Sequence, residues 1–321
     1  MKAIASLLVT LALVAGGCTN ETQQPPSDLR IVATTTIAGD LARSVVGEHG
    51  TVEVIMPLGA DPHDFSPSSR QVALLQEADL IVAFGLGLEE GLESSLRAVE
   101  AAGVPLLWIA EVVDPMLFED DSVDGHEDDG EDIDHDDEGD EGHSHEGFDP
   151  HVWMDPLRMA DAVHVLALRL SGIAPDVDWV NNAKFAAAEL LDADRQMREL
   201  LDRIPDDRRL LVTNHFSLGY FAERYGLIVL GTIIPGGGTL GAPSSADLAA
   251  LVSLITNTGA PAIFREPGDT TGLAEAIAAE VGHPVQVVSL TTDSLGEPGS
   301  DTDTLVKLLL TTARTIAEAL S

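Results

Sequence analysis

One stretch organises this chain, and it reads Asp149-Pro150-His151-Val152-Trp153-Met154-Asp155-Pro156. The pair Asp155-Pro156 predicts the start of a helix, because a carboxylate at the N-cap accepts hydrogen bonds from unpaired amides and proline fits the first turn. His151 is therefore expected in a loop that enters a helix. A second segment, residues 61–63, repeats the order Asp-Pro-His after a strand-like run. Two histidines held by stiff loops at strand ends can converge on one ligand, so we expect them to help bind a transition metal.

On both sides of this stretch, strands and helices alternate. The expected strands are continuous apolar runs, typical of strands that are buried on both faces of a parallel sheet. They span residues 30–35, 52–56, 80–84 and 105–109 in the first half, and 210–213, 228–233, 262–264 and 285–289 in the second. Helical segments separate them. This order predicts an α/β fold of two lobes, each a mostly parallel sheet flanked by helices.

A long helix is expected to join the two lobes. It covers residues 175–203 and ends before a proline, with a buried stripe predicted at Val180, Phe185, Ala188, Leu191, Met197 and Leu201. The predicted layout is therefore an N-terminal lobe over 29–174, a linking helix over 175–204 and a C-terminal lobe over 205–321.

The N-terminus resembles an export signal. Residues 1–17 hold one lysine, an apolar run too short for a permanent membrane span, and small residues before Cys18. This pattern resembles a bacterial lipobox, in which Cys18 is lipidated and residues 18–28 form a polar tether. The alternative is a soluble secreted protein with an incidental cysteine. Because the chain has no other cysteine, the mature protein is expected to have no disulfide bond.

The charge pattern limits the possible ligands. A formal net charge of −37 argues against nucleic-acid binding, which needs clustered Lys and Arg, and suits a cationic ligand. Much of the negative charge lies in an acidic loop over residues 119–147. Its histidines are His126, His135, His143 and His145. The loop is interpreted either as a solubilising segment or as a weak, multivalent zinc collector.

Polar side chains follow the strands at the edge where open α/β sheets bind ligands. Two come from each lobe: His63, His215 and Asp293 each come after a strand, and His151 lies in the loop between elements. Three imidazoles and one carboxylate suit zinc and are acceptable to manganese or iron. Glu266 reaches the same edge, where it is expected either to accept a hydrogen bond behind the ligands or to act as an alternative ligand.

Four segments carry a resemblance to a known family. They are Gly59-Ala60-Asp61-Pro62-His63-Asp64-Phe65-Ser66-Pro67, the stretch 149–156 quoted above, His215-Phe216-Ser217-Leu218-Gly219-Tyr220-Phe221-Ala222-Glu223-Arg224-Tyr225-Gly226-Leu227, and Thr292-Asp293-Ser294. In this order they resemble the zinc/manganese substrate-binding lipoproteins of ABC importers. The resemblance covers nearly the whole mature chain, and its motifs are specific in combination.

The resemblance implies a function. In that family the metal lies between two lobes, and the matching ligand positions are His63, His151, His215 and Asp293. It also implies delivery of the metal to an ABC permease and its ATPase, and a location in the periplasm or on the outer face of the cell membrane. A histidine at the third position favours zinc, with manganese as the alternative, because many manganese-preferring members carry a carboxylate there. Zinc-binding members often have an acidic insert like residues 119–147.

One stretch departs from the family pattern. Pro235-Gly236-Gly237-Gly238-Thr239 is richer in glycine than the family leads us to expect after that strand. It does not fit a phosphate-binding loop, because it has neither the Lys-Ser/Thr pair nor the GxGxxG spacing of such loops.

Two other classes of protein compete with the importer interpretation. A secreted metal-dependent hydrolase needs an open coordination position and a base, yet there is no His-Glu-x-x-His helix, and Glu266 is the only candidate base. A surface adhesin or metal sensor could use the same fold. We expect a binding protein without enzymatic activity, monomeric, that captures zinc outside the cell.

Overall fold

The computed structural model describes residues 29–118 and 147–321. The predicted signal peptide, Cys18 and its tether lie outside the described residues. So do the four histidines of the acidic loop, His126, His135, His143 and His145.

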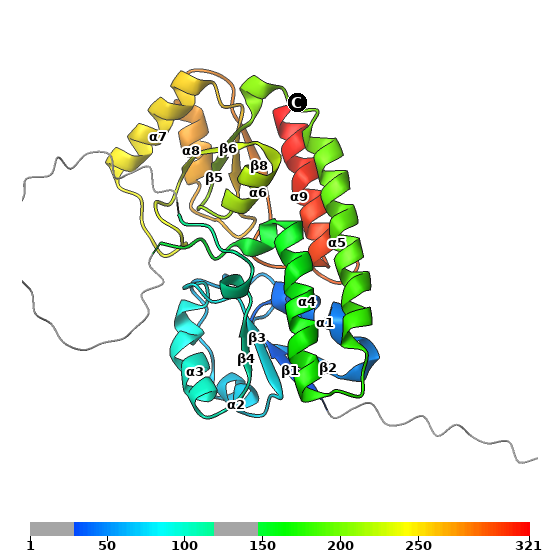
Figure 1. Cartoon of the computed structure of the whole chain (residues 1–321). Coiled ribbons are helices and arrows are strands. Elements are labelled where there is room, and N and C mark those ends of the chain that lie inside the picture. The colour runs from blue at the N-terminus through cyan, green and yellow to red at the C-terminus, as the bar shows by residue number, and fades with distance from the viewer. Residues whose placement is uncertain (1–28, 119–146) are drawn as a thin grey trace, which may run out of the picture.

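The N-terminal lobe is built on a four-stranded parallel sheet in the order β2-β1-β3-β4 (Figure 1). Its strands are β1 (Arg30–Ala33), β2 (Thr51–Val54), β3 (Leu80–Ala83) and β4 (Leu106–Trp108). The helices are α1 (Thr36–Val46), α2 (Ser69–Gln76) and α3 (Glu90–Ala101), with short 3-10 turns η1 (Gly47–His49) and η2 (Ala110–Val112). All four residues of β3 are buried, as expected for a central strand covered by helices on both faces.

The C-terminal lobe repeats this arrangement with the strand order β6-β5-β7-β8, again all parallel. Its strands are β5 (Leu210–Thr213), β6 (Ile228–Thr232), β7 (Ala262–Arg265) and β8 (Gln286–Ser289). The helices are α6 (Gly219–Tyr225), α7 (Ser245–Thr258), α8 (Leu273–Glu280) and α9 (Leu305–Leu320), with one 3-10 turn η5 (Asp206–Arg208). The predicted pair of parallel sheets is therefore confirmed.

Three elements connect the lobes: the 3-10 turn η4 (Val152–Met154), α4 (Pro156–Ile173) and the long α5 (Trp179–Leu201). Helix α5 runs alongside both lobes and packs against α4, α9 and α1 (Figure 1). The predicted start of α4 is confirmed, because the Asp155 side chain accepts from the Leu157 amide at 2.8 Å and Pro156 occupies the first turn. Helix α5 begins later than expected, because Asp178 caps it by accepting from the Asn181 amide.

The predicted buried stripe of α5 is mostly wrong. Phe185 is 69% exposed, and Val180, Ala188 and Leu191 are exposed as well. The buried face recurs every three or four residues at Trp179, Ala183, Ala186, Ala187, Leu190, Ala193, Met197 and Leu201. The small alanines on this face let α4 and α9 approach the helix closely. The prediction instead placed large apolar side chains in the core, although they do not lie on the same face of the helix as these alanines.

None of the described helices is both long and apolar enough to cross a membrane.

Candidate metal centre

Four side chains meet in the seam between the lobes. His63 lies on the loop after β2, His215 follows β5, Asp293 follows β8, and His151 precedes η4. One nitrogen or oxygen from each side chain lies within 4.8 Å of the corresponding atoms of the others, and all four residues are buried. The structure thus brings together the whole set that sequence reasoning placed at this edge. Their role as metal ligands remains a prediction.

The spacing of these atoms suits a single small cation. His63 Nε2 lies 3.2 Å from His151 Nε2, and His215 Nε2 lies 3.1 Å from Asp293 Oδ2. Four ligands at about 2.0–2.1 Å from a tetrahedral zinc ion are separated from one another by roughly 3.3 Å. The ring centroids of the three histidines are 5.2–5.6 Å apart in every pair.

The repeated order Asp-Pro-His has a structural cause that sequence reasoning did not identify. Asp61 Oδ1 accepts from the His63 backbone amide at 2.9 Å, and Asp149 Oδ1 accepts from the His151 amide at the same distance. In both segments the aspartate closes a tight turn onto the residue two positions later, with proline stiffening the turn between them. Each histidine is therefore held at the tip of a rigid turn.

Asp149 also orients the His151 ring. Its Oδ1 lies 2.7 Å from His151 Nδ1. Because an ionised carboxylate can only accept a hydrogen bond, Nδ1 carries the proton, and the lone pair of Nε2 faces the point where the other three ligand atoms meet. Asp149 is only 1% exposed, and its second oxygen has no hydrogen-bond partner in the described part of the chain. The only sequence signal for this role was an acid two residues before each histidine of the two motifs.

His215 differs from His151 in its surroundings. It is 1% exposed; its Nδ1 has no hydrogen-bond partner among the described residues, and its Nε2 lies 3.1 Å from Asp293 Oδ2. In the metal-free protein Nε2 is paired with the Asp293 carboxylate, so a cation bound between these two atoms would take the place of the proton on Nε2.

The titration behaviour of the cluster follows from burial and from its single ionised carboxylate. Burial opposes a charge on His215, but the adjacent Asp293 carboxylate outweighs it and raises the pKa of His215 to about 9. Burial also favours the neutral acid at Asp293, yet His215 holds the pKa of that carboxyl below its usual range. For His63, burial together with the neighbouring His151 lowers the pKa to about 3.

Glu266 lies behind Asp293 rather than in the cluster of four. The Thr292 hydroxyl contacts both Glu266 Oε1 and Asp293 Oδ1, the latter at 2.8 Å. A hydroxyl has one proton to donate, so both contacts can be hydrogen bonds only if Glu266 is protonated. Burial and the nearby Asp293 raise the pKa of Glu266 to about 8, which fits that requirement.

A cavity of about 580 Å³ opens beside Asp293. It lies between the lobes, lined on one side by residues 58–61 and on the other by loops of the C-terminal lobe. Of the described residues that line it, none is Lys or Arg, whereas the acidic ones are Asp61, Glu266, Asp269, Asp293 and Glu297. These acidic walls favour the approach of a cation to the site.

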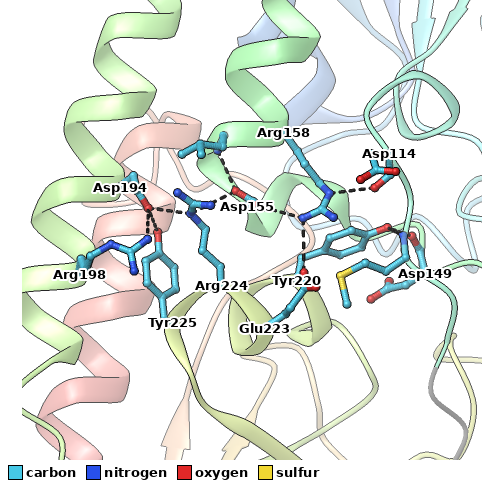
Figure 2. A network of polar contacts seen from close by, with 12 residues as sticks. Asp114, Asp149, Asp155, Arg158, Asp194, Arg198, Tyr220, Glu223, Arg224 and Tyr225 are labelled. Carbon is cyan, nitrogen blue, oxygen red and sulfur yellow. Dashed lines mark hydrogen bonds and ion pairs between the residues drawn. The ribbon is translucent and has the colours of Figure 1, made fainter.

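A polar network ties the segment after His215 to the segment after His151. Arg224, on α6, lies between Asp155 and Asp194, with Nε 3.3 Å from Asp155 Oδ1 and 2.7 Å from Asp194 Oδ1 (Figure 2). The Tyr225 hydroxyl donates to the same Asp194 oxygen at 2.9 Å. Helix α6 of the C-terminal lobe is thereby fixed both to the start of α4 and to the linking helix α5.

Tyr220 makes a second connection across the seam. Its hydroxyl donates to the Asp149 carbonyl at 2.7 Å and accepts from the Met116 amide at 2.8 Å (Figure 2). The Arg158 guanidinium stacks on the Tyr220 ring at 4.7 Å. On the other side of the site, the Trp153 indole donates to the Thr292 carbonyl at 2.9 Å. These contacts fix the spacing between histidines that belong to different lobes.

The comparisons with known proteins agree with this geometry. A family model described as "Zinc-uptake complex component A periplasmic" matches residues 31–319. The chain belongs to this family. The zinc-uptake component A family comprises solute-binding proteins of ABC transporters and not enzymes, so the expected absence of enzymatic activity is confirmed. The chain is thus a metal-binding, substrate-binding component of an ABC transporter.

Individual relatives match over most of the chain. The manganese-binding lipoprotein MntA of Halalkalibacterium halodurans is 25% identical, covering 98% of this chain and 97% of the relative. The iron-binding protein YfeA of Yersinia pestis is 25% identical, covering 98% and 93%. Among solved structures, the periplasmic zinc-binding protein TroA of Treponema pallidum matches with a TM-score of 0.78 and 25% identity, over 92% of this chain and 100% of TroA. The two-lobe α/β fold is therefore confirmed, and the names of these three relatives refer to manganese, iron and zinc respectively.

Proposed function

We propose that this protein captures one divalent transition metal ion outside the cell, zinc in preference to manganese, and delivers it to an ABC permease. The observation that carries the proposal is the buried convergence of His63, His151, His215 and Asp293 from two lobes, with ligand atoms within 4.8 Å of one another. Neutral imidazoles and an ionised carboxylate would replace the water shell of the ion, so binding would release protons and weaken as the pH falls.

The donor set supports zinc as the preferred metal. Zinc is commonly bound in tetrahedral sites rich in imidazole, whereas manganese favours more oxygen ligands and a higher coordination number. The description of the matching family and the name of TroA point the same way. Manganese is the alternative, and its support is the name of the H. halodurans relative.

The location of the protein is also a proposal. A signal peptide over residues 1–17 and a lipid on Cys18 would place the metal site at the outer face of the cell membrane, next to the permease and its ATPase. The lipoprotein name of the H. halodurans relative supports this. The acidic loop with His126, His135, His143 and His145 would collect zinc weakly.

Release to the permease requires that one group of ligands moves away from the other. Helix α5 packs along both lobes and the Arg224 network crosses the seam, which supports a small tilt or local loop opening rather than a wide hinge motion.

Elemental analysis of the purified protein, paired with competitive titration of the two metals, tests the choice of metal. We expect one zinc ion per chain and displacement of bound manganese by equimolar zinc. Retention of manganese in the presence of equimolar zinc would instead support the manganese alternative. Deletion of the gene is expected to impair growth at limiting zinc, while the protein turns over no ester or peptide.

A further inference from the structure

The glycine-rich stretch that departs from the family pattern lies between two segments of the N-terminal lobe. Residues 237–239 belong to the loop after β6, in the C-terminal lobe. On one side they contact Phe118, and on the other side they contact His63 and Asp61. A loop of one lobe is thus held between two parts of the other.

The contact with Phe118 explains one of the glycines. A Cβ atom placed on Gly237 would lie 2.1 Å from Phe118 Cζ, which is shorter than real Cβ contacts, so the ring would have to move. The Phe118 ring also packs edge-on against Phe216, next to the proposed ligand His215, with centroids 5.7 Å apart. The backbone of Phe118 is itself fixed, because its amide donates to the Gly147 carbonyl at 2.7 Å. The Phe118 ring is therefore held in place by these contacts and packs against the loop.

The contacts on the other side reach a proposed metal ligand. A Cβ atom on Gly238 would lie 3.4 Å from His63 Nδ1, so the backbone of the loop packs closely against the imidazole. The Thr239 hydroxyl donates to Asp61 Oδ2 at 2.5 Å. The other oxygen of Asp61 accepts from the His63 amide at 2.9 Å. Residues 238 and 239 thus support both the ring of His63 and the turn that carries it.

We propose that residues 237–239 act as a latch between the lobes that positions His63 and sets the rate at which the bound metal leaves. The proposal rests on the proposed function, since it requires that His63 binds the ion. Moving the lobes apart must withdraw the latch from between Phe118 and His63, and while it is seated the imidazole cannot turn away from the ion. Gly237 lacks a side chain because the Phe118 ring occupies that space.

Three variants test the contact between the ring and the glycine: Gly237→Ala, Phe118→Ala and the double variant. The measurement is the dissociation rate of zinc into excess chelator by stopped flow, alongside the equilibrium affinity. Gly237→Ala is expected to raise the dissociation rate at least tenfold with little change in the association rate, because its methyl group displaces the ring. In the Phe118→Ala background the same substitution should have less than a twofold effect, since the obstructing ring is gone. Gly282→Ala, where an added Cβ meets nothing within 4 Å, is the matched control and should match the wild type.

A second pair of variants tests the contact with the His63 turn. Thr239→Val removes the hydroxyl that binds Asp61 and should raise the dissociation rate, while Thr239→Ser keeps the hydroxyl and should restore the wild-type rate. This pair preserves side-chain size closely enough to remain informative if Gly237→Ala fails to fold.

The outcomes separate the latch from the site itself. The latch is refuted if wild-type protein binds zinc but Gly237→Ala and Thr239→Val release it within twofold of the wild-type rate. It is also refuted if Gly237→Ala has the same effect with and without Phe118, or if the Val and Ser variants behave alike. Wild-type protein that binds neither zinc nor manganese would overturn the proposed function, and the latch with it.

Discussion

Binding of zinc at neutral pH should release about one proton per ion, and His215 is its source. In the metal-free protein, Asp293 raises the pKa of His215 to about 9. Two pH units below its pKa, a group is about 99% protonated, so at pH 7 the His215 ring carries a proton that a metal ion must displace. His63 contributes none, because its pKa is lowered to about 3 and its ring is already neutral.

The same reasoning gives the dependence of affinity on pH. Release of one proton per ion makes the apparent affinity rise about tenfold between pH 7 and pH 8, equivalent to about 1.4 kcal/mol. The sign follows from the raised pKa: the proton on His215 competes with the metal below pH 9, and this competition disappears as the pH rises through that value. Affinity should therefore fall steadily as the solution is acidified from pH 8.

Isothermal titration calorimetry can count this proton. Zinc is titrated into the metal-free protein at pH 7 in several buffers that differ in ionisation enthalpy. When the observed binding enthalpy is plotted against the ionisation enthalpy of the buffer, the slope gives the number of protons released per ion. The variant Glu266→Gln removes the neighbouring carboxyl group whose pKa is raised to about 8, and it should leave the count at about one. A slope near zero in the wild type would show that His215 is neutral before the metal arrives, and would refute the pairing with Asp293.

Four further results are expected. Calorimetry should show zinc affinity lowered by more than about 100-fold on substitution by Ala of any one imidazole ligand, His63, His151 or His215, since loss even of a residue that only supports a ligand typically costs about 10–100-fold. Asp149→Asn keeps an oxygen near His151 Nδ1 but loses the charge, and should weaken zinc binding by about 10–100-fold in the same assay. Arg224→Met removes one partner from Asp155 and from Asp194, which keep Arg158 and Tyr225 respectively, and should lower the free energy of unfolding by about 1–2 kcal/mol in urea titration. Arg195→Met at an exposed pair should change it by less than about 0.5 kcal/mol. Deletion of residues 119–146 should leave affinity for the first ion within about threefold, because all four proposed ligands lie outside that loop; a larger loss would place a ligand inside it.

Features encoded in local sequence were predictable. The two parallel sheets followed from continuous apolar runs, because strands covered on both faces need apolar residues at every position, as in β3. The start of α4 followed from Asp155-Pro156. The placement of His63, His215 and Asp293 followed from a topological rule, since the carboxyl ends of parallel strands share one edge, and that of His151 followed from its Asp-Pro-His motif.

Features that depend on partners distant in sequence were not predictable. The buried face of α5 is set by its contacts with α4 and α9. The sequence of the helix alone does not specify this face, because apolar residues, large and small, occur on several of its faces. Phe118 packs against Gly237, although the two residues are more than a hundred positions apart in the sequence. From the sequence, Gly237 was recognised only as part of a stretch that departs from the family pattern. The role of Asp149 was hidden for a different reason, because Asp-Pro-His reads as a turn whether or not its carboxylate also orients an imidazole.

X-ray absorption spectroscopy of the zinc-loaded protein tests the central claim most directly. We predict a four-coordinate shell at about 2.0–2.1 Å, with three imidazoles and one carboxylate oxygen and no sulfur. A six-coordinate shell dominated by oxygen, or a shell with fewer than three imidazoles, would contradict the convergence of His63, His151, His215 and Asp293 on a single ion.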